Sequence, residues 1–340
     1  MWTVKYRPQT LDGIVGNKNA VDMLRQVVTS GRLPHLVIHG PAGCGKSTAV
    51  FALANELYGK DYERNLTYFN ASDFFDQGKR YLVRDKRFIR FLGTDDPKKI
   101  QYSVISIFKD LVNEYAAMGQ LDADYKIIFI DSAESLREDA QHALRRIMER
   151  YSKTCRFVFS TTQPSRLILP LRSRGLELFF TYVGEEDFTA FLKRVTEAEN
   201  LDVDEDAWGY LYMLCKGNIA CGLNILQTIS LENSGSKVDT EMIFTASKES
   251  IPAGVRELYR TILKKDLLAA RKVIDSLLIN DGMSGVEVIS QLHKVIWEET
   301  LQPEDIAAMM QKLSDADMLI RSGASDRIQL EALVTEMSNV

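Results

Sequence analysis

Residues 40–47 constrain this chain more than any other stretch, because they match the pattern G-x-x-x-x-G-K-[ST] of a phosphate-binding loop. A short apolar run over residues 34–39 precedes the loop, and an Ala- and Leu-rich run with helical spacing follows over 47–58. A buried strand, a glycine-rich turn and a helix form the context in which such a loop works. We therefore expect a nucleoside triphosphate site here, rather than a chance glycine-rich turn.

The residue types of this loop suit phosphate chemistry. Glycines let backbone N–H groups approach phosphate oxygens, and the N-terminus of the following helix adds partial positive charge. Lys46 is expected to contact the β- and γ-phosphates, and the Ser47 hydroxyl is expected to bind Mg²⁺. The nucleotide-binding residues predicted in the loop are Gly40, Pro41, Ala42, Gly43, Cys44, Gly45, Lys46, Ser47 and Thr48.

The composition is that of an ordinary globular protein, with 45% apolar and 26% charged residues. The net charge of −5 gives no overall basic signature, so any nucleic-acid contact has to come from a local patch. The four cysteines lack zinc-type spacing, which favours thiols in a reducing cytosol. No apolar stretch approaches ~18 residues and the start does not resemble a signal peptide, so we expect a cytoplasmic protein, or a nuclear one in a eukaryote.

Five apolar runs, near residues 36, 67, 127, 157 and 178, alternate with helical patterns. This alternation predicts an α/β domain with a parallel sheet covered by helices on both faces. Beyond residue 182 only helical periodicity remains, and a polar linker covers residues 233–236. We expect an α/β domain over residues 1–182, a small helical lid over 183–235 and an all-helical domain over 236–340.

The run over residues 125–130 delivers Asp131 at its carboxyl end, where a carboxylate would orient the Mg²⁺ shell. ATPases of this kind usually place a glutamate next, to polarise the attacking water, but here the residue is Ser132. Glu134 lies two positions further on and is expected to project elsewhere. Binding residues are therefore present, whereas the usual residue for water activation is not.

Two further segments carry basic and aromatic residues. The N-terminal arm, with Val4, Tyr6, Arg7 and Pro8, could lie over an adenine base or beside phosphates, or it could only tether the chain end. The segment from residue 74 to 97 interleaves six Lys and Arg with five aromatic residues. That mixture could bind a phosphate backbone or stack on bases, and it is also typical of a solvated loop or amphipathic helix.

In combination, residues 4–8, the phosphate-binding loop and residues 69–73, 143–149 and 173–174 resemble the clamp-loader AAA+ family, most closely its replication factor C small subunits from archaea and eukaryotes. The resemblance covers essentially the whole chain. It implies a five-subunit ring that uses ATP to open a sliding clamp and place it on primer–template DNA. It also implies that the C-terminal helical domain is the collar that joins the subunits.

The chain departs from the family pattern at several positions. The acidic box reads Asp131-Ser132-Ala133-Glu134, the sensor-1 position is Thr162, and the arginine of the lid is replaced by Ala220. The family's Ser-Arg-Cys motif ends in Gly175 but keeps Arg174, which the resemblance makes a finger acting on a neighbouring subunit. Residues 74–96 look like an insertion.

These departures predict a subunit that binds ATP (or ADP) with Mg²⁺ and hydrolyses it slowly. Its Arg174 would act as a finger on the ATP of a neighbouring subunit. Two alternatives stay open: a scaffold subunit that binds nucleotide only structurally, and a self-sufficient P-loop motor of the helicase or DNA-repair kind. Residues 101–108 also loosely match the peptide that fills sliding-clamp pockets, although the buried face of a domain helix explains their spacing better.

Overall fold

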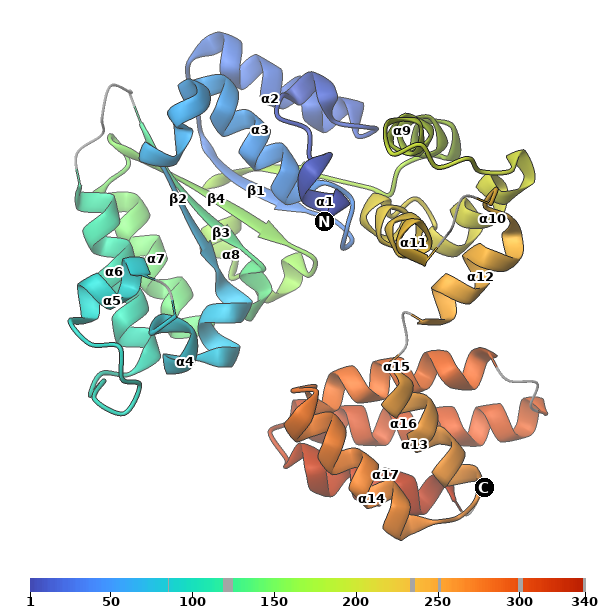
Figure 1. Ribbon diagram of the computed structural model, residues 1–340. Helices are drawn as coiled ribbons and strands as arrows, with labels where there is room; N and C mark the ends of the chain where they lie inside the picture. Colours follow the sequence, from blue (N-terminus) through green and yellow to red (C-terminus); the bar gives the residue numbers. More distant parts are fainter. Residues whose placement is uncertain (85, 119–124, 233–235, 250–251, 299–301, 339–340) are drawn as a thin grey trace. The chain divides into compact units, whose positions relative to one another are not determined.

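The computed structural model describes residues 1–84, 86–118, 125–232, 236–249, 252–298 and 302–338. They form two compact units, Met1–Thr240 and Glu241–Val340. The first unit contains a five-stranded sheet whose neighbouring strands are all parallel (Figure 1). Across the sheet the strands are β2 (Leu66–Asn70), β3 (Lys126–Asp131), β4 (Cys155–Thr161), β1 (His35–His39) and β5 (Gly175–Phe179). The predicted fold class and its five strands are confirmed.

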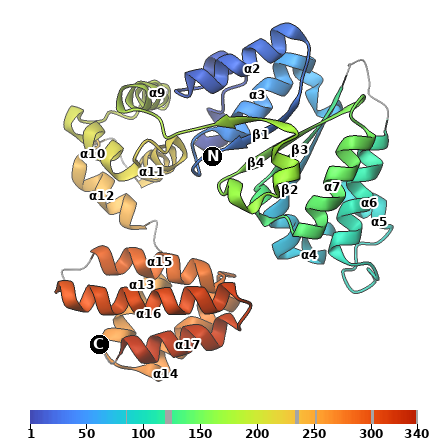
Figure 2. The same cartoon turned by 180° about the vertical axis from the view of Figure 1, so that it is seen from behind.

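The sheet is buried on both faces because its strands are apolar at successive positions. Leu36 and Ile38 of β1 belong to a core with α2 (Lys18–Ser30) and α3 (Lys46–Tyr58). Val37 points to the opposite core, which includes α6 (Val104–Ala117) and α7 (Glu138–Arg150). Figures 1 and 2 show these helix pairs on either side of the strands.

The basic and aromatic segment after β2 folds into short helices, η3 (Asp73–Gln77), α4 (Lys79–Leu82) and α5 (Lys86–Leu92). Phe74 and Phe88 are buried in the core beside α6, and Phe75 and Tyr81 pack against the same core. Base stacking is therefore the wrong interpretation for the buried rings of Phe74 and Phe88. The next helix, α6, begins at Val104, where Ser103 caps it by accepting a hydrogen bond from the Ser106 amide.

Three helices follow β5 in the first unit: α9 (Glu185–Ala198), α10 (Glu205–Cys215) and α11 (Ile219–Glu232). A short N-terminal helix, α1 (Trp2–Lys5), packs against α11. The Trp2 side chain is buried, and its backbone N–H donates to the Gln227 side-chain oxygen at 2.7 Å. The N-terminal arm and the lid therefore lie together.

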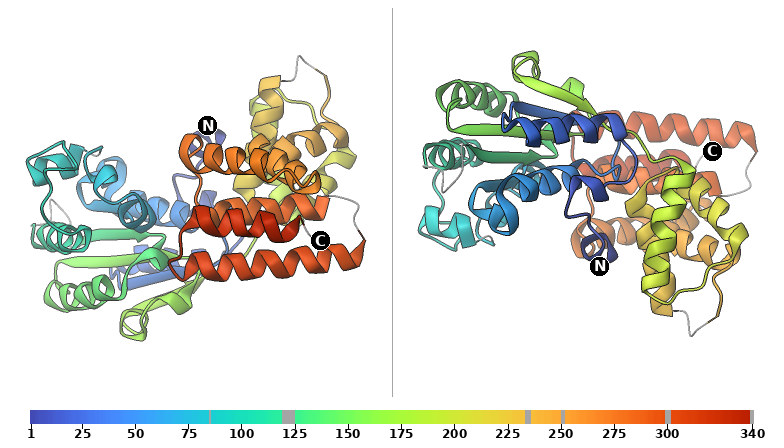
Figure 3. Two further views of the ribbon diagram at one scale, coloured as in Figure 1. Left: turned by 90° about the horizontal axis from the view of Figure 1, so that it is seen from below. Right: turned by 90° about the horizontal axis from the view of Figure 1, so that it is seen from above.

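The second unit (orange to red in Figure 3) is built from helices, and its described residues include no strand. Leu258, Leu292 and Leu313 are among the residues of its continuous core. The three domain limits expected from the sequence remain a prediction. Among the described residues, no helix combines the length and apolarity needed to span a membrane. The helices of this unit are α12 (Thr240–Glu249), α13 (Ala253–Leu263), α14 (Leu267–Asp275), α15 (Gly285–Glu298), α16 (Pro303–Arg321) and α17 (Asp326–Met337).

Candidate nucleotide site

The predicted phosphate-binding loop connects β1 to α3, as the sequence pattern requires. The Lys46 side chain is only 8% exposed, and its ammonium donates to the Gly40 carbonyl at 2.9 Å and the Pro41 carbonyl at 2.6 Å. The lysine therefore folds back onto its own loop, where an incoming phosphate would compete for the same ammonium group.

Ser47 and Asp131 come together although they lie 84 positions apart in the sequence. The Ser47 hydroxyl donates to an Asp131 carboxylate oxygen at 2.7 Å. A hydroxyl beside a carboxylate suits Mg²⁺, which usually takes its remaining ligands from water and phosphate oxygens. The described residues contain no cluster of three carboxylate, histidine or cysteine ligands, and a nucleotide-bound Mg²⁺ does not need one.

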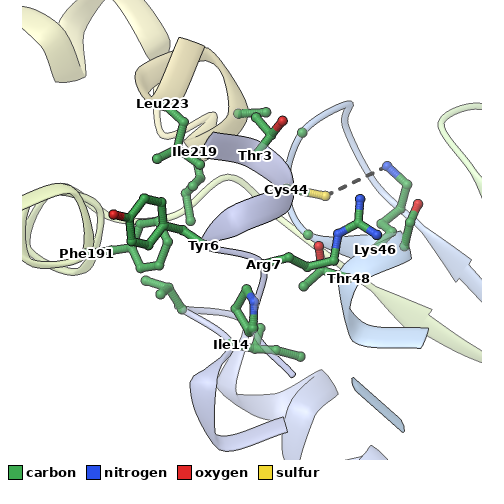
Figure 4. A pocket seen from close by; sticks show the side chains of 16 residues that line it. Thr3, Tyr6, Arg7, Ile14, Cys44, Lys46, Thr48, Phe191, Ile219 and Leu223 are labelled. Carbon is green, nitrogen blue, oxygen red and sulfur yellow. Dashed lines mark hydrogen bonds between the residues drawn. The ribbon is translucent and has the colours of Figure 1, made fainter. Parts of the chain in front are cut away.

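A cavity of about 190 Å³ lies between the loop, the N-terminal arm and the lid (Figure 4). Three predicted arm residues, Tyr6, Arg7 and Pro8, line it together with loop residues 43–48. Val4 does not: its side chain is exposed and makes no part of the cavity wall. The sequence analysis missed the remaining lining residues apart from Ala220; these are Thr3, Ile14, Val15, Phe191, Ile219 and Leu223.

Most of the missed residues are apolar, and they come from segments far apart in the sequence. An apolar wall with a few polar groups is typical of a pocket that binds a small molecule or cofactor. Ala220 also lines this cavity, so the lid presents a methyl group where the family pattern has an arginine.

The arm is tied to the lid by one carboxylate. Glu199 accepts a hydrogen bond from the Lys5 ammonium at 2.7 Å and from the Tyr6 hydroxyl at 2.5 Å. These hydrogen bonds hold the pKa of Glu199 below its usual value. At its other end the arm meets α3, because the Leu11 amide donates to the Glu56 carboxylate at 2.7 Å. The arm thus bridges the two walls of the cavity.

The lid also contacts the loop directly. The Asn218 side-chain amide donates to the Ala42 carbonyl at 3.3 Å. Gly43 has a φ of +74°, and a Cβ added there would lie 2.1 Å from the Asn218 side-chain oxygen. Position 43 therefore needs glycine both for its backbone conformation and for the room that the lid takes.

Water activation is the incomplete part of this site. Ser132 follows Asp131 in a left-handed conformation with a φ of +51°. Glu134 accepts hydrogen bonds from the Thr162 hydroxyl at 2.6 Å and the Thr162 amide at 3.3 Å. Glu134 does not line the nucleotide cavity, and its carboxylate engages the polar residue that follows β4.

Arg174 lies between α8 (Leu169–Arg172) and the edge strand β5. Its guanidinium donates to the Pro170 carbonyl at 2.6 Å and pairs with the Glu149 carboxylate at 2.7 Å. Glu177, the carboxylate nearest to Arg174 in the sequence, pairs with Arg172 instead. The Arg174 side chain keeps 34% of its surface accessible, so it is held but not buried.

The clamp-peptide interpretation of residues 101–108 is wrong for its aromatic anchor. Phe108 is fully buried and packs edge-on against Phe69 and Phe74. Ile107 is 1% exposed. An anchor residue of a docking peptide has to leave the domain that carries it, whereas these side chains build the core between α6 and the sheet.

Comparisons with known proteins agree with this architecture. Residues 36–181 match the family model "ATPase family associated with various cellular activities (AAA)", and residues 251–336 match "Replication factor C C-terminal domain". The replication factor C small subunit of Natronomonas pharaonis is 32% identical over 99% of this chain and 95% of its own length. That of Archaeoglobus fulgidus is 32% identical over 100% of this chain and 98% of its own length. The chain belongs to the replication factor C small-subunit family.

Solved structures show the fold at lower identity. The RuvB Holliday junction branch migration motor of Thermotoga maritima aligns with a TM-score of 0.51 at 15% identity, over 84% of this chain and 85% of that one. A RuvB variant from the same organism aligns with a TM-score of 0.52 at 16% identity, over 80% and 87%. These matches support the AAA+ fold, whereas the replication factor C relatives give the family.

Proposed function

We propose that this chain is a clamp-loader subunit that binds Mg-ATP in its own cavity, hydrolyses it slowly and supplies Arg174 to the ATP of a neighbouring subunit. Its partners would be other replication factor C subunits, a sliding clamp and primer–template DNA, as the family implies. The observation that carries the proposal is the contrast between the assembled Ser47–Asp131 pair and the absence of a glutamate at position 132.

Slow hydrolysis follows from what surrounds the expected γ-phosphate. Ser132 lacks a carboxylate that could polarise water, and Ala220 lacks the charge of a lid arginine. Loss of a general base typically costs ~10²–10⁴-fold in rate. Binding relies on other residues, chiefly Lys46, Ser47 and Asp131, so it should survive.

Arg174 has two features expected of a finger that acts in trans. It lies beside the edge strand of the sheet, and its guanidinium is partly accessible. Hydrogen bonds from Arg145 and Arg174 hold the pKa of Glu149 below its ordinary value, so Glu149 stays charged and keeps Arg174 in place. Arginine fingers are worth ~10³–10⁵ in rate when they stabilise charge on a transferring phosphoryl group.

Reconstitution with wild-type partner subunits tests the proposal. Arg174→Ala should lower ATP turnover at the one site that it serves by about 10³-fold or more, so the clamp- and DNA-stimulated ATPase activity of the assembly should lose that site's share. Arg172→Ala is the matched control, since Arg172 lies in the same turn and pairs with Glu177. Equal activity of the two assembled variants would favour a passive scaffold, and rapid hydrolysis by the chain alone would favour a self-sufficient motor.

A further inference from the structure

Two thiols meet at the turn between α10 and α11. Cys215 is the last residue of α10, and Cys221 lies in the first turn of α11. Their sulfur atoms are 2.9 Å apart, with the Cys215 thiol donating to the Cys221 sulfur. A disulfide bond is about 2.05 Å long, so the sulfurs would need to approach by only about 0.9 Å.

The turn itself is fixed by contacts on both sides, so the proximity of the thiols follows from the backbone. The Val183 amide donates to the Gly217 carbonyl at 3.2 Å. Gly217 has a φ of +81°, and a Cβ there would lie 2.2 Å from the Val183 carbonyl oxygen. The Asn218 side chain accepts from the Cys221 amide at 3.1 Å while contacting the loop at Ala42.

The two thiols have different environments, which suits them to different chemical roles. Cys221 is partly exposed, and its place at a helix N-terminus favours a negatively charged sulfur. Cys215 is buried, and its hydrogen bond to Cys221 together with burial raises the pKa of its thiol. Cys221 is thus the better nucleophile, and Cys215 lies close enough to the Cys221 sulfur to resolve a mixed disulfide there.

We propose that Cys215 and Cys221 are a reversible modification site, which a small-molecule disulfide oxidises to an intramolecular disulfide. The Cys221 thiolate attacks one sulfur of the small disulfide, and the other sulfur leaves as a thiolate. Cys215, losing its proton, then attacks the Cys221 sulfur of the mixed disulfide and expels the second small thiol. In sum, two protein thiols are oxidised and one small disulfide is reduced to two thiols.

The bond would close a short ring around the turn that touches the nucleotide site. That turn carries Asn218, which contacts the phosphate-binding loop, and residues Ile219 and Ala220, which line the cavity. A tethered turn loses conformational freedom, so the oxidised chain should release nucleotide about threefold more slowly. This second step rests on the proposed binding of ATP, whereas formation of the disulfide does not.

Peptide mapping of the full chain tests the site. The chain is equilibrated in glutathione buffers of increasing oxidised fraction, quenched in acid, blocked with N-ethylmaleimide and digested with trypsin. Cleavage after Lys216 puts the two cysteines in separate peptides, so the disulfide appears as a cross-linked pair that reductant separates. Cys215→Ser and Cys221→Ser should each abolish that pair, and Cys155→Ser should leave it unchanged.

Absence of the cross-linked pair in the folded chain, while a reference dithiol in the same buffers is oxidised, would overturn the proposal. Pairing of Cys221 with Cys44 or with a second copy would overturn it as well. Release of a fluorescent ATP analogue is then compared between oxidised and reduced chain. Equal release rates would refute the link to the cavity, whereas no binding in either state would refute the proposed nucleotide function and leave the disulfide standing.

Discussion

At the loop end of the nucleotide site, Lys46, Ser47 and Asp131 lie where phosphate and Mg²⁺ would need them. At the end of β4, by contrast, the polar side chains are engaged with one another, since Thr162 donates to Glu134. Under the function proposed above, the side chains that would bind Mg-ATP are present, whereas position 132 holds serine where the family pattern has glutamate. Binding and hydrolysis would then depend on separate side chains, so a subunit could lose one and keep the other.

Placing a carboxylate at position 132 should give the largest effect on this chain's own ATP turnover, an increase. Ser132→Glu should raise ATP turnover in the assembled complex by about 10²-fold, the lower end of what a general base supplies. Single-turnover hydrolysis measures the chemical step directly. Ser132→Gln has nearly the same shape without the charge and should stay slow. Equal rates for the two variants would contradict water activation by a carboxylate at position 132.

Removing the Lys46 ammonium tests the side chains that are proposed to bind the phosphates. Lys46→Met should weaken Mg-ATP binding by about 10- to 150-fold, because a hydrogen bond to a charged group contributes about 1.5–3 kcal/mol. Equilibrium titration with a fluorescent ATP analogue measures this loss. Lys18→Met is a control on the same domain outside the cavity wall. Unchanged affinity of Lys46→Met would show that the loop no longer holds phosphate.

His35 lies at the end of β1 that is opposite the phosphate-binding loop. Its protonation should therefore affect the stability of the fold without affecting the nucleotide site. His35 accepts a hydrogen bond from the Phe157 amide at 3.0 Å, and burial lowers the pKa of His35 from 6.5 to about 4. The unfolded chain therefore binds the proton more readily between these values, and the folded state loses stability as the pH falls from 7 to 4. We expect the free energy of unfolding to fall by about 2 kcal/mol over this range, a value discounted because His35 is partly exposed.

Denaturant unfolding at pH 7 and pH 5 measures the His35 contribution. His35→Asn keeps a hydrogen-bond acceptor without a titratable ring, so the variant should lose less stability than the wild type over this range. The two chains should bind ATP equally at pH 7. A parallel pH dependence in wild type and variant would contradict the assignment to His35.

Removing the contact between Glu134 and Thr162 should have the smallest effect on ATP turnover. Glu134→Ala frees the Thr162 hydroxyl, which could then orient water, so turnover should rise by about threefold in a Ser132→Glu background. Thr162→Val in the same background should lower it, because the hydroxyl is lost. If both variants match the Ser132→Glu parent, the end of β4 takes no part in hydrolysis.

The sequence predicts the fold well where a signal is local. The five strands follow from short apolar runs, and the loop follows from a fixed spacing that includes Gly45 and Lys46. Asp131 could be placed because parallel strands bring their carboxyl ends to one edge of a sheet. The roles of Ser132 and Arg174 came instead from comparison with the family pattern.

Features that depend on residues meeting only in the folded chain could not be predicted from the sequence. Phe191, Ile219 and Leu223 form the lid side of the cavity, but in the sequence they look like any apolar position of an amphipathic helix. Phe108 fitted a docking motif because a buried helix face and a clamp peptide share the same spacing. The Glu134–Thr162 contact joins residues 28 positions apart, and no sequence pattern predicts it.

The contact between Gly43 and Asn218 has a consequence for how this sequence can diverge. The amide group of the lid occupies the space that any side chain at position 43 would need. A smaller residue 218 would free that space, but the φ of +74° would still strain any residue that carries a Cβ at position 43. Among relatives, residue 218 should therefore vary more freely than residue 43, even though the two residues touch across the loop and the lid.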